Sequence, residues 1–170
     1  MFTLLRLIFA LIIGCFFASC AETPNRVVSL AGAHRLHQVR TTAYSRGEDG
    51  GRRNAVGQYL SGRHVMSAAS DWSRFPLGTR FRIVDTSEEY VIDDYGTALI
   101  GTNTIDLYKP SRLDMKRWGV RHVDIDVLQW GSKEQSLKVL APRAKHRTVR
   151  RMIVALQKKS SSHQGGAAFD

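Results

Sequence analysis

Three aspartates, Asp71, Asp94 and Asp106, lie beside turn-forming residues or between apolar residues in the middle of this chain. Asp94 precedes Tyr95-Gly96, where the backbone turns tightly, and Asp106 in a strand faces away from its two apolar neighbours. Apolar surroundings, or a second carboxylate close by, keep a carboxyl group protonated near neutral pH. The group therefore predicts a general acid for a glycosidic oxygen, although most aspartates at turns only cap backbone N–H groups or face solvent.

Short alternating runs predict the strands that would position these acids. Residues 38–45 are rich in Val, Thr and Tyr, and residues 79–85 place Phe81 and Ile83 on the face opposite two arginines. Residues 89–92 form another run, and the turn formers at 85–87 predict a hairpin between these two.

A longer alternation covers residues 120–130. Its apolar face holds Val123, Ile125 and Val127, so Asp124 and Asp126 are expected to be solvated, as is Asp93 in its own strand. One helix is expected between Pro110 and Gly119, begun by a capping box of Ser111 and Asp114 and supplying buried contacts through Leu113 and Trp118. Several short strands, many glycines and one helix indicate a compact all-β barrel.

The motifs around the acids are specific in combination. They are Thr42-Ala43-Tyr44, Asp71 followed by Pro76-Leu77-Gly78-Thr79, Asp94-Tyr95-Gly96, Ile105-Asp106-Leu107-Tyr108 and Trp118-Gly119. Together they resemble the three-aspartate (3D) domain, a family of double-psi β-barrels that includes the catalytic part of membrane-bound lytic transglycosylase A and the stationary-phase muralytic proteins. The resemblance covers just over half of the chain.

The resemblance implies a six-stranded double-psi β-barrel at residues 38–132 that cleaves peptidoglycan as a lytic transglycosylase. Asp106 would be the main general acid and then base, while Asp94 and Asp71 orient it, tune its pKa and bind sugar hydroxyls. The residues implied to contact the glycan are Thr42, Tyr44, Gly96 and Thr79. Two rivals are a glycan-binding module without activity on the same barrel and an inverting glycoside hydrolase.

Two departures from the family pattern fall in one loop. The family usually has a Gly-Gly-Ala-Ile-Lys-Gly run after its second aspartate, whereas residues 96–101 read Gly-Thr-Ala-Leu-Ile-Gly and lack the lysine. One extra residue also separates Asp94 from Asp106. Because proton transfer depends on geometry, the placement of this loop is decisive for the enzyme hypothesis.

The N-terminus predicts export. An apolar run from Leu7 to Ala18 follows a short basic start, and small residues come after it, as in a secretory signal peptide at residues 1–20. Cys20 follows Phe17-Ala18-Ser19, which resembles a lipobox and implies a lipid-anchored protein of the periplasm. The alternatives are ordinary cleavage after Ala21 and an uncleaved anchor. Residues 21–37 are expected to be a tether.

The positive charge of the chain lies mainly in its tail, at residues 133–170. The 170 residues carry a formal net charge of +10, and helical spacing of Val149, Met152, Ile153 and Leu156 predicts a basic helix before a disordered end. This helix would either lie on an anionic membrane or polymer, or dock on the barrel with its charges in water. Export argues against nucleic acid as the partner.

No cofactor or metal site is expected in this chain, which we expect to be a monomer. His34 and His37 lie near each other within the expected tether, but no further metal ligands stand beside them.

Overall fold

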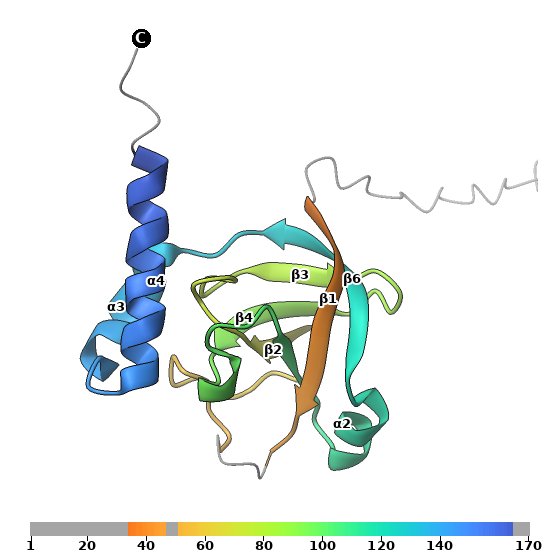
Figure 1. Ribbon diagram of the computed structural model, residues 1–170. Coiled ribbons are helices and arrows are strands. Elements are labelled where there is room, and N and C mark those ends of the chain that lie inside the picture. Colours follow the sequence, from red (N-terminus) through yellow and green to blue (C-terminus); the bar gives the residue numbers. More distant parts are fainter. Residues whose placement is uncertain (1–33, 47–50, 165–170) are drawn as a thin grey trace, which may run out of the picture.

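The computed structural model describes residues 34–46 and 51–164, and within them six strands form a closed barrel (Figure 1). The strands are β1 (His34–Tyr44), β2 (Val65–Ala69), β3 (Arg80–Ile83), β4 (Glu89–Asp94), β5 (Ile105–Tyr108) and β6 (Arg121–Gln129). Around the barrel they follow the order β1-β5-β2-β4-β3-β6, in which β1–β5 and β2–β4 are parallel pairs. The expectation of an all-β barrel is confirmed.

The barrel interior is filled by the apolar residues of the alternating runs. Phe81, Ile83 and Ile125 are fully buried, and Val123 and Val127 are nearly so. Their outward neighbours are polar and pair across the surface, as Arg82 does with Glu89 at 2.6 Å. A period of two, apolar inward and polar outward, is what a sheet closed around a core requires.

The first strand is longer than the sequence predicts. Strand β1 begins at His34, so four residues expected in the tether belong to it, and three of them pair with β6, in the register Arg35↔Asp126. The register shifts between Leu36 and Val39, where Gln38 has a positive φ of 52°. This bulge interrupts the alternation, which hides the first half of the strand from a search for period two.

The helix after β5 matches its capping signals but not its expected packing. Helix α2 (Arg112–Trp118) begins where the Ser111 side chain accepts a hydrogen bond from the Asp114 backbone N–H, and Gly119 ends it with a φ of 62°. Trp118 is buried, whereas Leu113 is 57% exposed, so the expectation that Leu113 contributes buried contacts is wrong. The buried residue of this helix is Trp118, at its C-terminal end.

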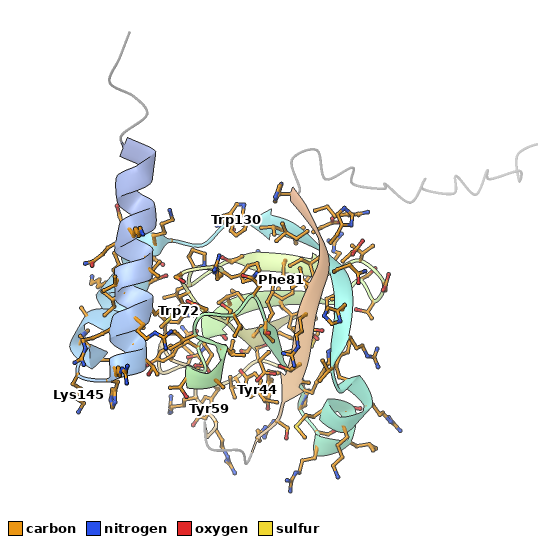
Figure 2. All side chains as sticks on the ribbon, in the orientation of Figure 1. Tyr44, Tyr59, Trp72, Phe81, Trp130 and Lys145 are labelled. Carbon is orange, nitrogen blue, oxygen red and sulfur yellow. The ribbon has the colours of Figure 1, made fainter. Side chains whose placement is uncertain are left out.

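Two helices follow the barrel, α3 (Lys133–Leu140) and α4 (Arg147–Gln164), and α4 packs against the barrel side (Figure 1). Val149, Met152 and Leu156 are buried, and the backbone N–H of Trp72 donates to the Met152 Sδ at 3.2 Å. Trp72 lies between barrel and helix (Figure 2). This is the docked arrangement of the two considered for the tail, with the arginine side chains of α4 exposed to solvent.

Candidate active site

Two of the three aspartates stand in one row across the outside of the barrel. In the register of the sheet Thr42 lies opposite Asp106, Asp106 opposite Ala69, and Ala69 opposite Asp94. Residues directly opposite each other point to the same face, and neighbouring strands lie about 4.8 Å apart, so the two acids are roughly 10 Å apart at their backbones. The buried neighbours of Asp106, Ile105 and Leu107, point into the barrel. The predicted outward direction of Asp106 is therefore confirmed.

Asp106 is held in place by the neighbouring strand. The Thr42 hydroxyl donates to the Asp106 Oδ1 at 2.6 Å, a short hydrogen bond. The carboxyl group is half-buried and thus shielded without being closed off. The Thr42 hydroxyl, implied by the resemblance to contact the glycan, thus orients Asp106.

Asp94 lies in surroundings that favour its protonated form. The pKa of Asp94 is raised to about 6, mainly by burial and also by the charge of its neighbour Asp93, against backbone hydrogen bonds from Tyr95 and Ala55 and the positive charge of Arg143. The Tyr95 N–H donates to the Asp94 Oδ1 at 2.9 Å. A carboxyl group with a pKa near 6 is protonated in part of the molecules at neutral pH, which suits a general acid.

Asp93 is a third acid of this face, and its expected position in solvent is wrong. The pairing of β2 with β4 passes from Ala68↔Ile92 to Ala69↔Asp94, so Asp93 is the extra residue of a bulge. Burial raises its pKa, against hydrogen bonds from Ser67 and Asn54 to its Oδ2 at 2.7 and 2.8 Å. The sequence signal that could have identified this position is the pair of adjacent acids, Asp93 and Asp94, at the end of an apolar strand. Bulges often lie beside active sites.

Tyr44 brings a hydrogen-bond donor to the same face. Its ring lies against the Tyr108 ring at 5.5 Å between centroids. Burial raises its pKa far above the ordinary value, and the charges of Asp94, Asp93 and Asp106 add to this effect. The hydroxyl therefore stays protonated, and all three carboxylates lie near enough to act on it.

Several polar atoms around Asp94 are buried without a hydrogen-bond partner among the described residues. They include the Tyr44 hydroxyl, the Asp93 Oδ1 and the Arg143 Nη1. The other end of the Arg143 guanidinium donates to the Ala55 carbonyl at 2.7 Å, which fixes the loop that covers Asp94. Buried polar groups are nearly always paired, so unpaired polar atoms gathered beside an acid set this face apart from the rest of the barrel.

Asp71 does not join this row. It is only 2% exposed, and its two carboxylate oxygens accept hydrogen bonds from the backbone N–H groups of Ser73 and Gly101 at 2.8 and 2.7 Å. Gly101, with a φ of 89°, belongs to the loop that joins Asp94 to Asp106. Asp71 thus holds the loop between Asp94 and Asp106 through its hydrogen bond from Gly101.

The remaining predicted contacts serve the backbone. Thr79 is fully buried, and its hydroxyl donates to the Pro76 carbonyl at 2.7 Å and accepts from the Gly131 N–H at 3.0 Å, so a direct contact with a polymer is excluded in this structure. Gly96 precedes the short helix η2 (Thr97–Leu99), and a Cβ there would meet the Leu99 side chain at 3.2 Å. Trp72 belongs to the core and donates through its Nε1 to the Asp94 carbonyl at 2.8 Å.

The site thus holds one carboxyl group that favours its proton, a second that is oriented by a threonine, and a protonated phenol near both.

Cys20 and the expected signal peptide lie outside the described residues. Among the residues that the structure describes, no helix has the length and apolar character to cross a bilayer. No family model matches the chain, and no curated protein matches it either.

Proposed function

We propose that this protein is a peptidoglycan lytic transglycosylase of the double-psi β-barrel type. The single observation that carries the proposal is the row Thr42, Asp106, Ala69 and Asp94 on the outer face of the barrel. The small side chain of Ala69 separates the two acids, and the parallel pairs β1–β5 and β2–β4 support the double-psi topology. Peptidoglycan is proposed as the substrate because of the motifs that resemble the 3D domain.

Asp106 is proposed as the general acid and then the base. Its proton passes to the oxygen that bridges N-acetylmuramic acid and N-acetylglucosamine, the bond to the anomeric carbon breaks, and an oxocarbenium-like species forms. The carboxylate then takes the proton of the same sugar's 6-hydroxyl, whose oxygen closes onto the anomeric carbon. The products are a 1,6-anhydro end and a free hydroxyl, and no water is consumed. This differs from the two-carboxylate hydrolases.

The surroundings supply the other roles. Thr42 aims the Asp106 carboxyl group, and the protonated Tyr44 hydroxyl lies close to the acids of the row. Asp94 has the raised pKa that a proton donor needs, so it is the second candidate for the first step. If Asp106 is the donor, the negative charge of Asp94 helps to keep Asp106 protonated. Asp71 contributes to the proposed reaction only by holding the loop between Asp94 and Asp106 in place.

The test is digestion of purified peptidoglycan sacculi by the purified protein, with mass spectrometry of the released fragments. The wild type should release 1,6-anhydro muropeptides, and Asp106→Asn should lower the rate at least 100-fold, a typical contribution of general acid–base catalysis. A matched control is Asp124→Asn, because Asp124 is also an aspartate on an outward strand face but pairs with His37 far along the barrel.

The products separate the rivals. Fragments with reducing ends would assign the protein as a hydrolase, and binding to sacculi without release would assign it as a glycan-binding module. Comparison of Asp94→Asn with Asp106→Asn then identifies the proton donor, since loss of the donor also removes the limb of the pH–rate profile that reports its protonated form.

A further inference from the structure

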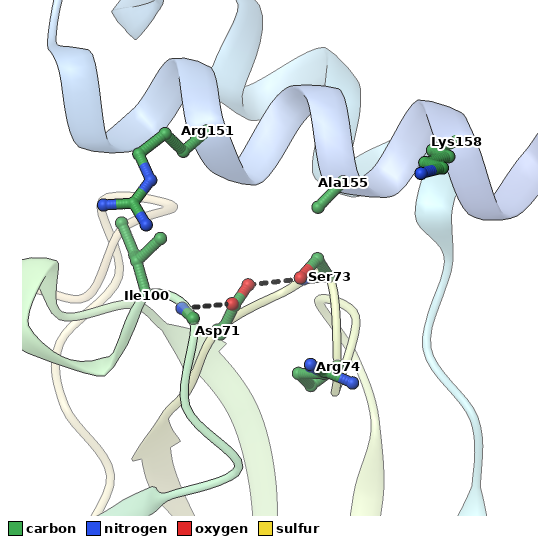
Figure 3. Close-up of a pocket in the computed structure, with 8 residues that line it drawn as sticks. Asp71, Ser73, Arg74, Ile100, Arg151, Ala155 and Lys158 are labelled. Atoms are coloured by element: carbon green, nitrogen blue, oxygen red, sulfur yellow. Dashed lines mark hydrogen bonds between the residues drawn. The ribbon is translucent and has the colours of Figure 1, made fainter.

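A second concave site lies between the barrel and helix α4, away from the row of acids. Its volume is about 520 Å³, within the range of sites for small ligands. The walls include the apolar side chains of Ile100, from the loop after β4, and Ala155, from α4. Figure 3 shows the gap between this loop and the helix, with Arg151 directed toward it.

Positive charge lines this cavity without being neutralised. Arg74 stands on the barrel side, and Arg151 and Lys158 stand on α4. All three side chains are exposed, and within the described part of the chain no ion pair or hydrogen bond involves them. The acid at the floor, Asp71, already accepts two backbone hydrogen bonds. The cavity therefore holds more cations than acids and favours an anionic ligand.

The spacing of the cations selects the kind of anion. Arg151 and Lys158 are seven residues apart on one helix, which corresponds to about 10 Å along its axis. Two carboxylates at a similar separation on one extended ligand can pair with both charges at once, one with each. An extended peptide rises about 3.3 Å per residue, so acidic groups two to three residues apart meet both cations. Ile100 and Ala155 then contact the apolar stretch between the acids.

We propose that this cavity binds a short acidic peptide that carries two carboxylates about 10 Å apart. Arginine suits a carboxylate because its guanidinium donates two parallel hydrogen bonds, and lysine provides the second charge. The inference does not require the proposed glycan cleavage. If that function holds, the ligand is a peptide stem attached to the glycan, and the cavity places it beside the loop that joins Asp94 to Asp106.

The test is isothermal titration calorimetry of the full chain with acetyl-Ala-Glu-Ala-Ala, whose two carboxylates are the glutamate side chain and the free C-terminus. The expected result is binding that weakens as salt is raised. The double variant Arg151→Gln and Lys158→Gln should raise Kd at least tenfold. The control is Lys145→Gln with Arg147→Gln, which removes the same charge from exposed positions outside this cavity and should change Kd less than twofold.

The ligand can be varied as well as the protein. The neutral peptide acetyl-Ala-Gln-Ala-Ala-amide should bind at least tenfold more weakly to the wild type, which tests the proposal even if the double variant fails to fold. Equal binding of both peptides, equal loss in the control variant, no binding at all, or tighter binding of pyrophosphate would each overturn it. None of these outcomes bears on sacculus digestion, so failure here is distinguishable from failure of the proposed function.

Discussion

Replacing Asp94 with asparagine should stabilise the folded protein at neutral pH, at the expense of activity. Burial raises the pKa of Asp94 from 3.8 to about 6, which means that the folded state disfavours the ionised carboxylate. The shift corresponds to at most about 3 kcal/mol of lost stability at pH values above both pKa values. Asparagine carries no charge at any pH and does not incur this loss.

The sign follows from which state releases its proton first. Between pH 3.8 and 6 the unfolded chain is already ionised at this position while the folded protein still holds the proton. The stability of the wild type therefore falls as pH rises through this window, and it levels off above pH 6. The variant lacks this fall, so the difference between the two proteins grows from near zero at pH 3.5 to its full size near pH 7.5.

The assay is urea unfolding of both proteins at several pH values, read as free energies of unfolding. Because the comparison is one of pH dependence, a constant loss from the changed hydrogen bonds to Tyr95 and Ala55 does not affect it. Asp126→Asn serves as a control of opposite sign. The hydrogen bond from Arg35 lowers the pKa of Asp126, so its contribution is present at neutral pH and is lost on acidification. Parallel curves for wild type and Asp94→Asn from pH 4 to 7.5 would refute the reasoning.

Two further predictions concern neighbouring features. Asp93→Asn should lower the pKa of Asp94, because it removes a like charge that raises this pKa; NMR titration of the carboxyl carbons measures the shift, and an unchanged value would contradict the assigned contact. Leu156→Ala should lower the free energy of unfolding by about 2–5 kcal/mol, because Leu156 is fully buried between α4 and the barrel. Val154→Ala, at a position 62% exposed on the same helix, should change it by less than about 0.5 kcal/mol, and an equal effect of both would contradict the docking of α4.

Local signals predicted those elements that depend on local causes. Phe81 and Ile83, and likewise Val123 and Ile125, follow the period of two, and all are buried as expected. Helix α2 follows from the cap at Ser111. Strand β2 was not predicted, because its Val65–Ala69 segment ends in small residues whose place is decided by the strands on either side.

The sequence identified Asp94 and Asp106 as candidate site residues, but it did not predict how the strands would arrange them. Asp94 and Asp106 share a face because of a register between strands that are distant in sequence, and no local pattern encodes that register. Asp71 looked equivalent to them, yet its carboxylate is used by the N–H of Gly101, thirty residues further along. Asp93 was judged by strand alternation, and the bulge breaks that alternation.

The position of β1 has a consequence for how the chain reaches this structure. The first strand lies between β5 and β6, the last two strands of the barrel to be synthesised, and Arg35 joins Asp126 across 91 residues. Pairings of such long range form slowly, after the intervening chain is available. The ring of strands cannot close on a ribosome-bound fragment that ends before residue 121. Such a nascent chain lacks both pairings of β6, with β1 and with β3, and so keeps two unpaired strand edges until residues 121–129 are synthesised.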